Sequence, residues 1–514
     1  MQSCACVLAT LTLAALPASA SARTYLVFVD GSSAPGAVAR EAGAQTDFEF
    51  TRVANGFAAN LSDSQAAELA ADPRVTEIRE DQPFALAQFG TADFETGAFG
   101  GEAFRRGDFS SEAFRRGDFS SEAFRRGDYD AEAFRRGAFR RGDYDAEAFR
   151  RGAFRRGAFR RGSVGTPYVS QWTPTGVQRI GAAGWADNVN ADIAILDSGI
   201  DRTHRDLNVR YAGSCVPGED GRDLSGHGTM VAGLAAARDN RFGVVGAAPG
   251  ARIWSVKVSD EAGTIMESAA LCGLEFVLNN ASSIEVANLS WSGYSESLGS
   301  SCSDLQVPSG STTNVRGRRS HGGGIRGRSR HRGVVAPSPQ PASGSTGNDV
   351  DPDTIDALHA VLCGVVDAGV TVVAAAGNDA ADADSYLPAA WPETIAVSSF
   401  SDTDGRPGGM GRPGCLTGDA DDTFSSFSNF GSSITIAAPG ECLLSTDIDG
   451  GYAYGSGTSF ATPLVAGVAA VYASRDRRST PSSIREKLLA TAEAGPIAGD
   501  PDNSQEGMLR ASRR

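Results

Sequence analysis

The chain has 514 residues, 41 % of them hydrophobic, and its 62 acidic residues outnumber 47 lysines and arginines for a formal net charge of −15. At roughly 100–200 residues per domain this length allows two or three domains with a sizeable core. The acidic total argues against nucleic acid as the main partner. After the first 22 residues no run approaches the roughly 18 apolar residues of a membrane span, so we expect no membrane anchor.

Residues 1–22 have the pattern of a signal peptide. The apolar stretch VLATLTLAAL at 7–16 is followed by Pro17 and the small-residue run ASASA, which fits cleavage after Ala20 or Ala22. The basic residues usual before such a stretch are absent, so a mis-assigned start or an ordinary buried segment is the alternative. We predict export and an extracellular, secreted protein.

Two of the eight cysteines, at positions 4 and 6, would leave with the signal peptide. The others are Cys215, Cys272, Cys302, Cys363, Cys415 and Cys442. An even number of cysteines in an exported protein indicates disulfides, but the sequence does not determine which cysteines pair. No cysteine stands in a Cys-x-x-Cys pair and no histidine has an evident metal-binding partner, so we predict no zinc site.

Residues 23–88 are predicted to form a small α+β domain. Its expected elements are strands at 23–29 and 75–78 and a short helix at 65–71.

Residues 89–163 change character completely. The unit EAFRRG recurs with a period of ten and later shortens to AFRRG, a period far below that of a solenoid repeat. A glycine in each unit and mixed charge indicate a disordered linker. The alternatives are a protease-sensitive activation tether, because dibasic sites invite cleavage, and an adhesive segment that uses arginine–aromatic contacts.

From 164 to 514 strand and helix patterns alternate. This alternation predicts a three-layer α/β fold, a parallel sheet with helices on both faces. The expected strands are 191–196, 251–258, 283–289 and 370–375, and the expected helices are 227–237, 264–279, 354–368 and 459–474. A stretch at about 306–347, rich in Gly, Ser, Arg and Pro, interrupts the pattern. We interpret it as a disordered surface insertion or a gene-model error rather than an RGG-like nucleic-acid arm.

Three short segments carry the residue types of nucleophilic catalysis. Asp197 ends a buried strand in ILDSG, His227 starts a helix in GHGT, and Ser459 lies in the first turn of an apolar helix in GTSFATP. A parallel sheet places such positions at one edge. Each residue alone could be a turn or cap residue, but together they supply an orienting acid, a base and a nucleophile.

These segments resemble the signatures of the subtilisin-like serine proteases. DSGID at 197, GHGTMVAGL at 226 and GTSFATPLVAG at 457 carry the resemblance. It extends from about 164 to about 492 apart from the insertion, and is closest to the proteinase K-like and related secreted bacterial branches. It implies a serine endopeptidase in which Ser459 attacks the scissile carbonyl, His227 takes its proton and passes it to the leaving amine, and Asp197 orients His227. No cofactor enters this chemistry.

The resemblance also implies an oxyanion hole. Asn378, in AAAGN, matches the family's oxyanion-hole asparagine, whose amide would act with the backbone N–H of Ser459. Loss of such a donor typically lowers the turnover rate by a factor on the order of 10²–10³. The alternative for Asn378 is a turn residue that closes the strand at 370–375.

Two further segments match the walls of the family's pocket for the substrate residue before the scissile bond (P1). They are Ser290, Trp291 and Ser292, which would lie antiparallel to the substrate backbone, and Ala375, Ala376 and Gly377. Both walls are neutral, so we predict a preference for apolar or aromatic P1 residues. Ser292 stands where the family often has glycine, and its side chain could hinder the close approach of the substrate backbone at this position.

The N-terminal domain resembles the family's inhibitory propeptide through YLVFV at 25, NGFAA at 55 and DPRV at 72. This implies a proenzyme that its own propeptide inhibits, with proteins or peptides as substrates, and we expect a monomer. Many members of the family bind structural calcium. The acidic stretches 402–404 and 419–422 are either ligands or ordinary surface acid, so calcium ligands are not assigned.

Two other functions compete with this one. The first is a secreted binding protein on an inactive protease scaffold, which uses the arginine-rich repeats to engage an acidic partner. The second is a zymogen that never activates itself and waits for a dibasic-specific protease.

Overall fold

The computed structural model describes residues 23–87, 171–184, 189–295, 301–302, 356–414, 417–502 and 506–512. The predicted signal peptide (1–22), repeat linker (89–163) and insertion (306–347) lie outside these residues. The chain divides into two compact units, one up to Gln82 and one from Pro83. Each is described by itself.

The first unit is a four-stranded antiparallel sheet with two helices. In spatial order its strands are β2 (Thr46–Phe50), β3 (Gly56–Leu61), β1 (Arg23–Val29) and β4 (Val75–Glu80), and its helices are α1 (Pro35–Glu41) and α2 (Asp63–Ala70). Val27, Phe57 and Leu61 form its core. The strands predicted at 23–29 and 75–78 are confirmed. The helix begins two residues earlier than predicted, because Ser62 and Gln65 form a capping box at its start.

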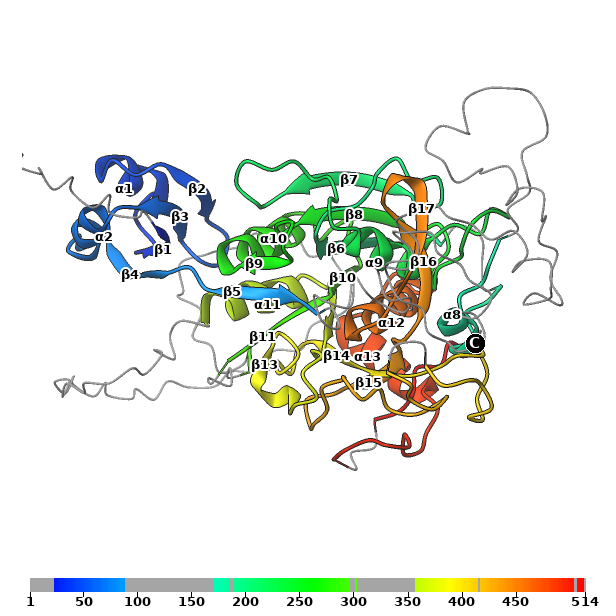
Figure 1. The fold of residues 1–514 in the computed structure, drawn as a ribbon. Coiled ribbons are helices and arrows are strands. Elements are labelled where there is room, and N and C mark those ends of the chain that lie inside the picture. Colours follow the sequence, from blue (N-terminus) through cyan, green and yellow to red (C-terminus); the bar gives the residue numbers. More distant parts are fainter. Residues whose placement is uncertain are drawn as a thin grey trace, which may run out of the picture. The chain divides into compact units, whose positions relative to one another are not determined.

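The second unit is built on a seven-stranded sheet in which every pairing is parallel (Figure 1). In spatial order the strands are β15 (Ile436–Pro439), β14 (Ile395–Phe400), β12 (Thr371–Ala375), β10 (Val286–Leu289), β6 (Asp192–Asp197), β8 (Arg252–Lys257) and β7 (Val209–Ser214). The central strands are buried on both faces, as expected for a parallel sheet covered by helices. The predicted α/β fold is therefore confirmed.

Helices cover both faces of this sheet. Ile193 and Ile195 of β6 share a core with α9 (His227–Ala236), whereas Leu196 of the same strand faces Gly273 of α10 (Glu267–Asn279). Because successive side chains of a strand point to opposite faces, α9 covers one face, and α10 covers the other together with α11 (Asp356–Asp367), against which it packs. The long helix α12 (Thr458–Arg475) packs beside α9, and together they form the larger core with Ile193 and Ile195 of β6.

Short strands form a second, antiparallel sheet in this unit. Its order is β13 (Tyr386–Leu387), β11 (Trp291–Tyr294), β5 (Pro83–Leu86) and β9 (Thr264–Met266). The helix predicted over 264–279 is wrong in its first turn, because residues 264–266 extend and pair with β5. The other elements are the hairpin β16 (Leu443–Asp447) and β17 (Gly451–Gly455), the helices α8 (Thr175–Arg179) and α13 (Pro481–Thr491), and the 3₁₀ turns η2 (Ala383–Ser385) and η3 (Ile448–Gly450).

The expected disulfides are present. Cys215 pairs with Cys272 and Cys302 pairs with Cys363, and Cys442 is also disulfide-bonded.

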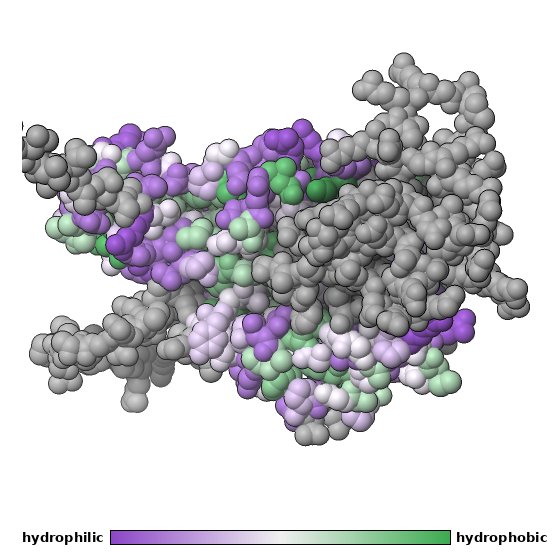
Figure 2. Space-filling model, in the orientation of Figure 1, coloured by the Kyte–Doolittle hydropathy of each residue, from purple (hydrophilic) through white to green (hydrophobic). Residues whose placement is uncertain are grey.

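In the part of the chain that the structure describes, no helix is long and apolar enough to cross a membrane. On the face drawn in Figure 2, purple hydrophilic residues are interspersed with smaller green hydrophobic areas.

A buried cation connects α8 to distant parts of the second unit. Nε of Arg179 donates to Asp422 at 2.8 Å and Nη1 donates to Glu493 at 3.0 Å. The buried carboxylate of Asp402 lies 3.9 Å from the same Nε. Burial, together with repulsion from Asp421 and Asp422, raises the pKa of Asp402 to about 7.

This raised pKa predicts a pH-dependent loss of stability. In the unfolded chain an aspartate titrates near 3.9, so between about pH 4 and pH 7 the folded chain binds a proton that the unfolded chain has lost. The free energy of unfolding therefore falls as pH rises through this window, by at most about 4 kcal/mol. We predict that, in the metal-free protein, Asp402→Asn removes this loss and raises the melting temperature more at pH 8 than at pH 5. An equal shift at the two pH values, measured by thermal unfolding, would contradict the prediction.

Candidate active site

The predicted acid and base meet at the carboxyl edge of the parallel sheet. Asp197 is the last residue of β6 and His227 is the first residue of α9. Both side chains are fully buried, and Oδ1 of Asp197 is hydrogen-bonded to Nδ1 of His227 at 2.7 Å. Among the described residues Nε2 of His227 has no hydrogen-bond partner, so this nitrogen is available to a third group.

Glycine allows these two elements to approach so closely. A Cβ on Gly228 would lie 2.1 Å from the carbonyl oxygen of Gly199 and 3.0 Å from Oδ1 of Asp197. Gly226, immediately before α9, has φ +95°, a conformation that favours glycine. Any other residue at 226 or 228 would therefore disturb the contact between Asp197 and His227.

The predicted nucleophile lies at the start of α12. Ser459 is the second residue of this helix, and its Oγ is buried without a hydrogen-bond partner in the part of the chain that the structure describes. The ring of the next residue, Phe460, packs edge-on against the ring of His227 with centroids 5.4 Å apart. The starts of α9 and α12 therefore lie side by side, with Asp197, His227 and Ser459 in one region.

A proline and a serine hold the first turn of α12 in place. Pro463 has no N–H, so the carbonyl of Ser459, four residues earlier, receives no hydrogen bond from within the helix. Oγ of Ser290 donates to this carbonyl at 2.8 Å. The predicted pocket residue Ser290 thus also anchors the predicted nucleophile.

Asn378 and Ser459 direct two N–H groups at one carbonyl. Nδ2 of Asn378 donates to the carbonyl oxygen of Ala87 at 2.6 Å, and the backbone N–H of Ser459 donates to it at 3.3 Å. Oδ1 of Asn378 accepts from the N–H and the hydroxyl of Thr458, at 2.9 and 3.0 Å, which fixes the orientation of the amide. Two fixed donors on one oxygen are the arrangement that stabilises an oxyanion.

Ala87 reaches these donors because the chain before it is a strand. β5 pairs antiparallel with β11, with Leu86 opposite Trp291 and Ala85 opposite Ser292. The N–H of Ala87 donates to the carbonyl of Ser290 at 3.0 Å, and β9 pairs with the other side of β5. The segment 290–292 thus lies antiparallel to an extended peptide, and the serine at 292 does not prevent the pairing.

The second predicted wall lies beside the first. Ala375 ends β12, and Ala375, Ala376 and Gly377 are all buried. A Cβ on Gly377, which has φ +105°, would lie 3.2 Å from Oγ of Ser292 and 2.4 Å from Nδ2 of Asn429. The two walls therefore meet at Gly377, where a side chain has no room.

Comparison with protein families agrees with this geometry. The profile described as the subtilase family matches residues 189–511, and the profile described as peptidase inhibitor I9 matches residues 21–87. This chain belongs to the subtilase family. The resemblance predicted from the motifs, including the inhibitor-type N-terminal domain, is confirmed. The I9 match ends at Ala87, the residue whose carbonyl the two donors bind.

Bacterial subtilases are similar to this chain. Subtilisin amylosacchariticus of Bacillus subtilis subsp. amylosacchariticus is 32 % identical over 308 residues, which are 59 % of this chain and 60 % of that protein. Subtilisin of Bacillus pumilus is 32 % identical over 308 residues, 59 % of this chain and 84 % of that protein. M-protease of Shouchella clausii (strain KSM-K16) is 32 % identical over 329 residues, 63 % of this chain and 66 % of that protein.

The match thus spans about 60 % of the length of the first of these subtilases. Among solved structures, the crystal structure of a cold adapted subtilisin-like serine proteinase matches with a TM-score of 0.45 and 24 % identity, over 66 % of this chain and 98 % of that chain.

Two side chains of this subtilase support the site although the motifs did not reveal them. The carboxylate of Asp223 accepts hydrogen bonds from Ser198, Ser225, Gly226 and Thr229, and so fixes the loop before His227. Nζ of Lys257, buried at the end of β8, donates to the carbonyl of Ser198 at 2.8 Å and lies 3.3 Å from Glu219. Two features of the sequence could have pointed to these residues. Asp223 is an acidic residue four positions before His227, and Lys257 is a lysine at the end of an apolar strand.

Among the residues that the structure describes, two groups of side chains outside this site have donor atoms close enough together for a metal ion. One is Asp402, Asp404 and Asp421, and the other is Cys302, His359, Cys363 and Glu393, with donor atoms in each group within 4.8 Å of one another. The first group falls on the acidic stretches that the sequence singled out.

We predict that Asp223→Ala destabilises the fold and disturbs His227. The substitution removes the acceptor of buried donors on Ser198, Gly226 and Thr229, so we expect a loss of about 3 kcal/mol in the free energy of unfolding. Urea unfolding measures this, with Asp220→Ala as the control, because Asp220 is an exposed residue in the same loop. Equal stability of the two variants would show that Asp223 does not organise the loop.

Proposed function

We propose that the protein is a secreted serine endopeptidase, made as a proenzyme, that hydrolyses peptide bonds through an acyl-enzyme at Ser459. The observation that carries the proposal is the carbonyl of Ala87, which receives both N–H groups that a peptidase of this family directs at a scissile carbonyl. Membership of the subtilase family and an I9-type domain at the N-terminus support it.

In the proposed reaction Oγ of Ser459 attacks the carbonyl carbon, and its proton passes to Nε2 of His227. The bond between Nδ1 and Asp197 supports this step, because it fixes the ring and favours the charged imidazolium. The negative charge that develops on the substrate oxygen is stabilised by Asn378 and the backbone N–H of Ser459. His227 then protonates the leaving amine, and water releases the acyl group by the same steps in reverse order.

The first substrate of this reaction is proposed to be the chain itself. β5 occupies the place of an extended peptide between β11 and β9, and the carbonyl of Ala87 is the one that the oxyanion donors bind. We therefore assign self-cleavage to the peptide bond that follows Ala87. After cleavage, residues 83–87 would still fill the strand position and inhibit the enzyme until they leave.

The proposed specificity follows from the lining of the two walls. Residues 290–292 and 375–377 contribute no charge, so a charged P1 side chain would lose its hydration there without gaining a partner. Apolar or aromatic P1 residues are therefore preferred in cleavage of other proteins or peptides.

The remaining parts of the chain complete the proposal. Residues 1–22 form a signal peptide, 23–88 an inhibitory propeptide, 89–163 a linker, and 164–514 a monomeric catalytic domain with an insertion at about 306–347. The disulfides Cys215–Cys272 and Cys302–Cys363 support an extracellular location, because disulfides persist in oxidising compartments. The proposed steps use protein groups alone, and a structural calcium would have oxygen donors in the group formed by Asp402, Asp404 and Asp421.

The experiment compares the secreted wild type with Ser459→Ala by intact mass, N-terminal sequence and hydrolysis of a peptide with an aromatic P1 residue. We predict that the wild type loses residues up to at least Ala87 and hydrolyses the peptide. Ser459→Ala keeps the bond after Ala87 and is inactive, because it lacks the nucleophile. Ser474→Ala, near the end of the same helix α12, is the matched control and should behave as the wild type does.

Two outcomes would contradict this proposal in different ways. Full maturation of Ser459→Ala would assign processing to another protease, as expected for a zymogen that does not activate itself. A correctly folded, prodomain-free wild type that does not hydrolyse peptides would favour a binding protein on an inactive scaffold.

A further inference from the structure

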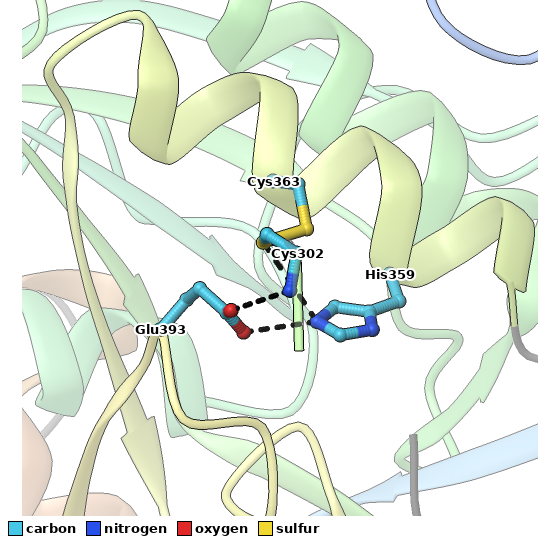
Figure 3. Close-up of a disulfide and its surroundings, with 4 residues drawn as sticks. All are labelled: Cys302, His359, Cys363 and Glu393. Carbon is cyan, nitrogen blue, oxygen red and sulfur yellow. Dashed lines mark hydrogen bonds and ion pairs between the residues drawn. A yellow bond between two sulfur atoms is a disulfide. The ribbon is translucent and has the colours of Figure 1, made fainter. Parts of the chain in front are cut away.

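Four potential metal ligands, the two cysteines of the second disulfide and two neighbouring side chains, lie together, and none of them belongs to the proposed active site. His359 and Cys363 lie four residues apart on α11 and therefore on one face of the helix, as in helical pairs of metal ligands. Cys302 follows β11 in the chain, and Glu393 follows β13. Figure 3 shows that the side chains of all four residues point toward one another.

The contacts in this cluster are short and well defined. Nε2 of His359 lies 3.0 Å from Oε2 of Glu393 and 4.0 Å from Sγ of Cys302 (Figure 3). Oε1 of Glu393 accepts the backbone N–H of Cys302 at 2.7 Å, which leaves Oε2 facing the histidine. The donor atoms of Cys302, His359, Cys363 and Glu393 all lie within 4.8 Å of one another.

The surroundings fix the histidine in this orientation. Its side chain is fully buried, and its ring stacks on the ring of Trp391 with centroids 4.6 Å apart and planes 2° apart. This stacking directs Nε2 at the sulfur and carboxylate atoms, so the ring would not have to turn to bind an ion. The side chain of Glu393 is 14 % exposed and Cys302 is half-buried, so solutes can reach the cluster.

We propose that reduction of the Cys302–Cys363 disulfide converts this cluster into a four-ligand Zn²⁺ site, with both Sγ atoms, Nε2 of His359 and Oε2 of Glu393 as ligands. Thiolates, an imidazole and a carboxylate are the ligand types that Zn²⁺ takes in tetrahedral sites. Ca²⁺ and Mg²⁺ would bind poorly, because both prefer oxygen donors. The absence of a Cys-x-x-Cys pair hid the site in the sequence, because one sulfur comes from a separate segment.

The chemistry of the conversion balances. A trialkylphosphine breaks the S–S bond and becomes the phosphine oxide with an oxygen atom from water, whose two protons go to the two sulfurs. Zn²⁺ then displaces both thiol protons into solvent, and the imidazole proton moves from Nε2 to Nδ1. Two thiolates and Glu393 leave the loaded site with a charge of −1. Arg485 lies close to this charge, since its guanidinium donates to the carbonyls of Pro392 and Thr394 on either side of Glu393.

The site would replace one cross-link by another. The disulfide joins Cys302 to α11, and a bound Zn²⁺ would keep that link and add Glu393 to it. The chain segments that follow β11 and β13 would then stay attached to α11 when the disulfide is open, before it first forms or after it is reduced.

The test uses the full chain with Ser459→Ala, so that its result does not depend on peptidase activity. The protein is reduced with a trialkylphosphine, freed of it by gel filtration without oxygen, and titrated with Co²⁺, whose visible absorption is intense in tetrahedral thiolate sites. We expect one tightly bound Co²⁺ per chain after reduction, displaced by Zn²⁺, and none before reduction. Zn²⁺ should also raise the melting temperature of the reduced protein.

Variants assign the signal to this cluster. The double variant with Cys302→Ser and Cys363→Ser should abolish the Co²⁺ absorption. The control with Cys215→Ser and Cys272→Ser removes a different disulfide and should retain this absorption. His359→Gln and Glu393→Gln keep the disulfide, so their fold is checked before reduction, and each should weaken Co²⁺ binding by more than about tenfold. The proposal is overturned by a signal that persists without Cys302 and Cys363, by a reduced protein without the tetrahedral spectrum, or by a reduced protein that unfolds and that Zn²⁺ does not restore.

Discussion

The hydrogen bond between Asp197 and His227 is the contact on which the rest of the site depends. It joins the end of a central strand to the start of a helix over 2.7 Å, and both side chains are fully buried. Only a glycine at 228 leaves room for this approach, and Asp223 holds the loop that delivers the histidine. The parallel sheet is therefore needed to bring together, at one edge, residues that are 30 positions apart in the chain.

At the same edge, one backbone N–H and one side-chain N–H point at the same carbonyl oxygen. The N–H of Ser459, in the first turn of α12, and the amide of Asn378 converge on the carbonyl of Ala87, and Thr458 prevents the amide from turning. Pro463 leaves the carbonyl of Ser459 without a helical partner, and Ser290 supplies the missing hydrogen bond. The donors are thus held in position before a substrate arrives, and this preorganisation makes an oxyanion hole effective.

Much of the fold could be predicted because buried parallel strands are continuous apolar runs, so β6, β8, β10 and β12 were evident in the sequence. The short strands β5, β11 and β13 were not predicted, because they are stabilised by pairing with one another over long chain separations. The motifs named the residues that converge at the sheet edge. They did not name Asp223 or Lys257, whose roles depend on buried hydrogen bonds to a neighbouring loop. The cluster around His359 was hidden for a related reason, since its four donors come from three separate segments.

The central claim is that Asp197 and His227 activate Ser459 for attack on a carbonyl. The most direct measurement is labelling of the mature protein with a fluorophosphonate, followed by peptide mapping of the adduct. The account predicts a single adduct on Ser459, and loss of rapid labelling in a folded His227→Ala variant. An adduct on another residue, or labelling of Ser459 at an unchanged rate without His227, would contradict it.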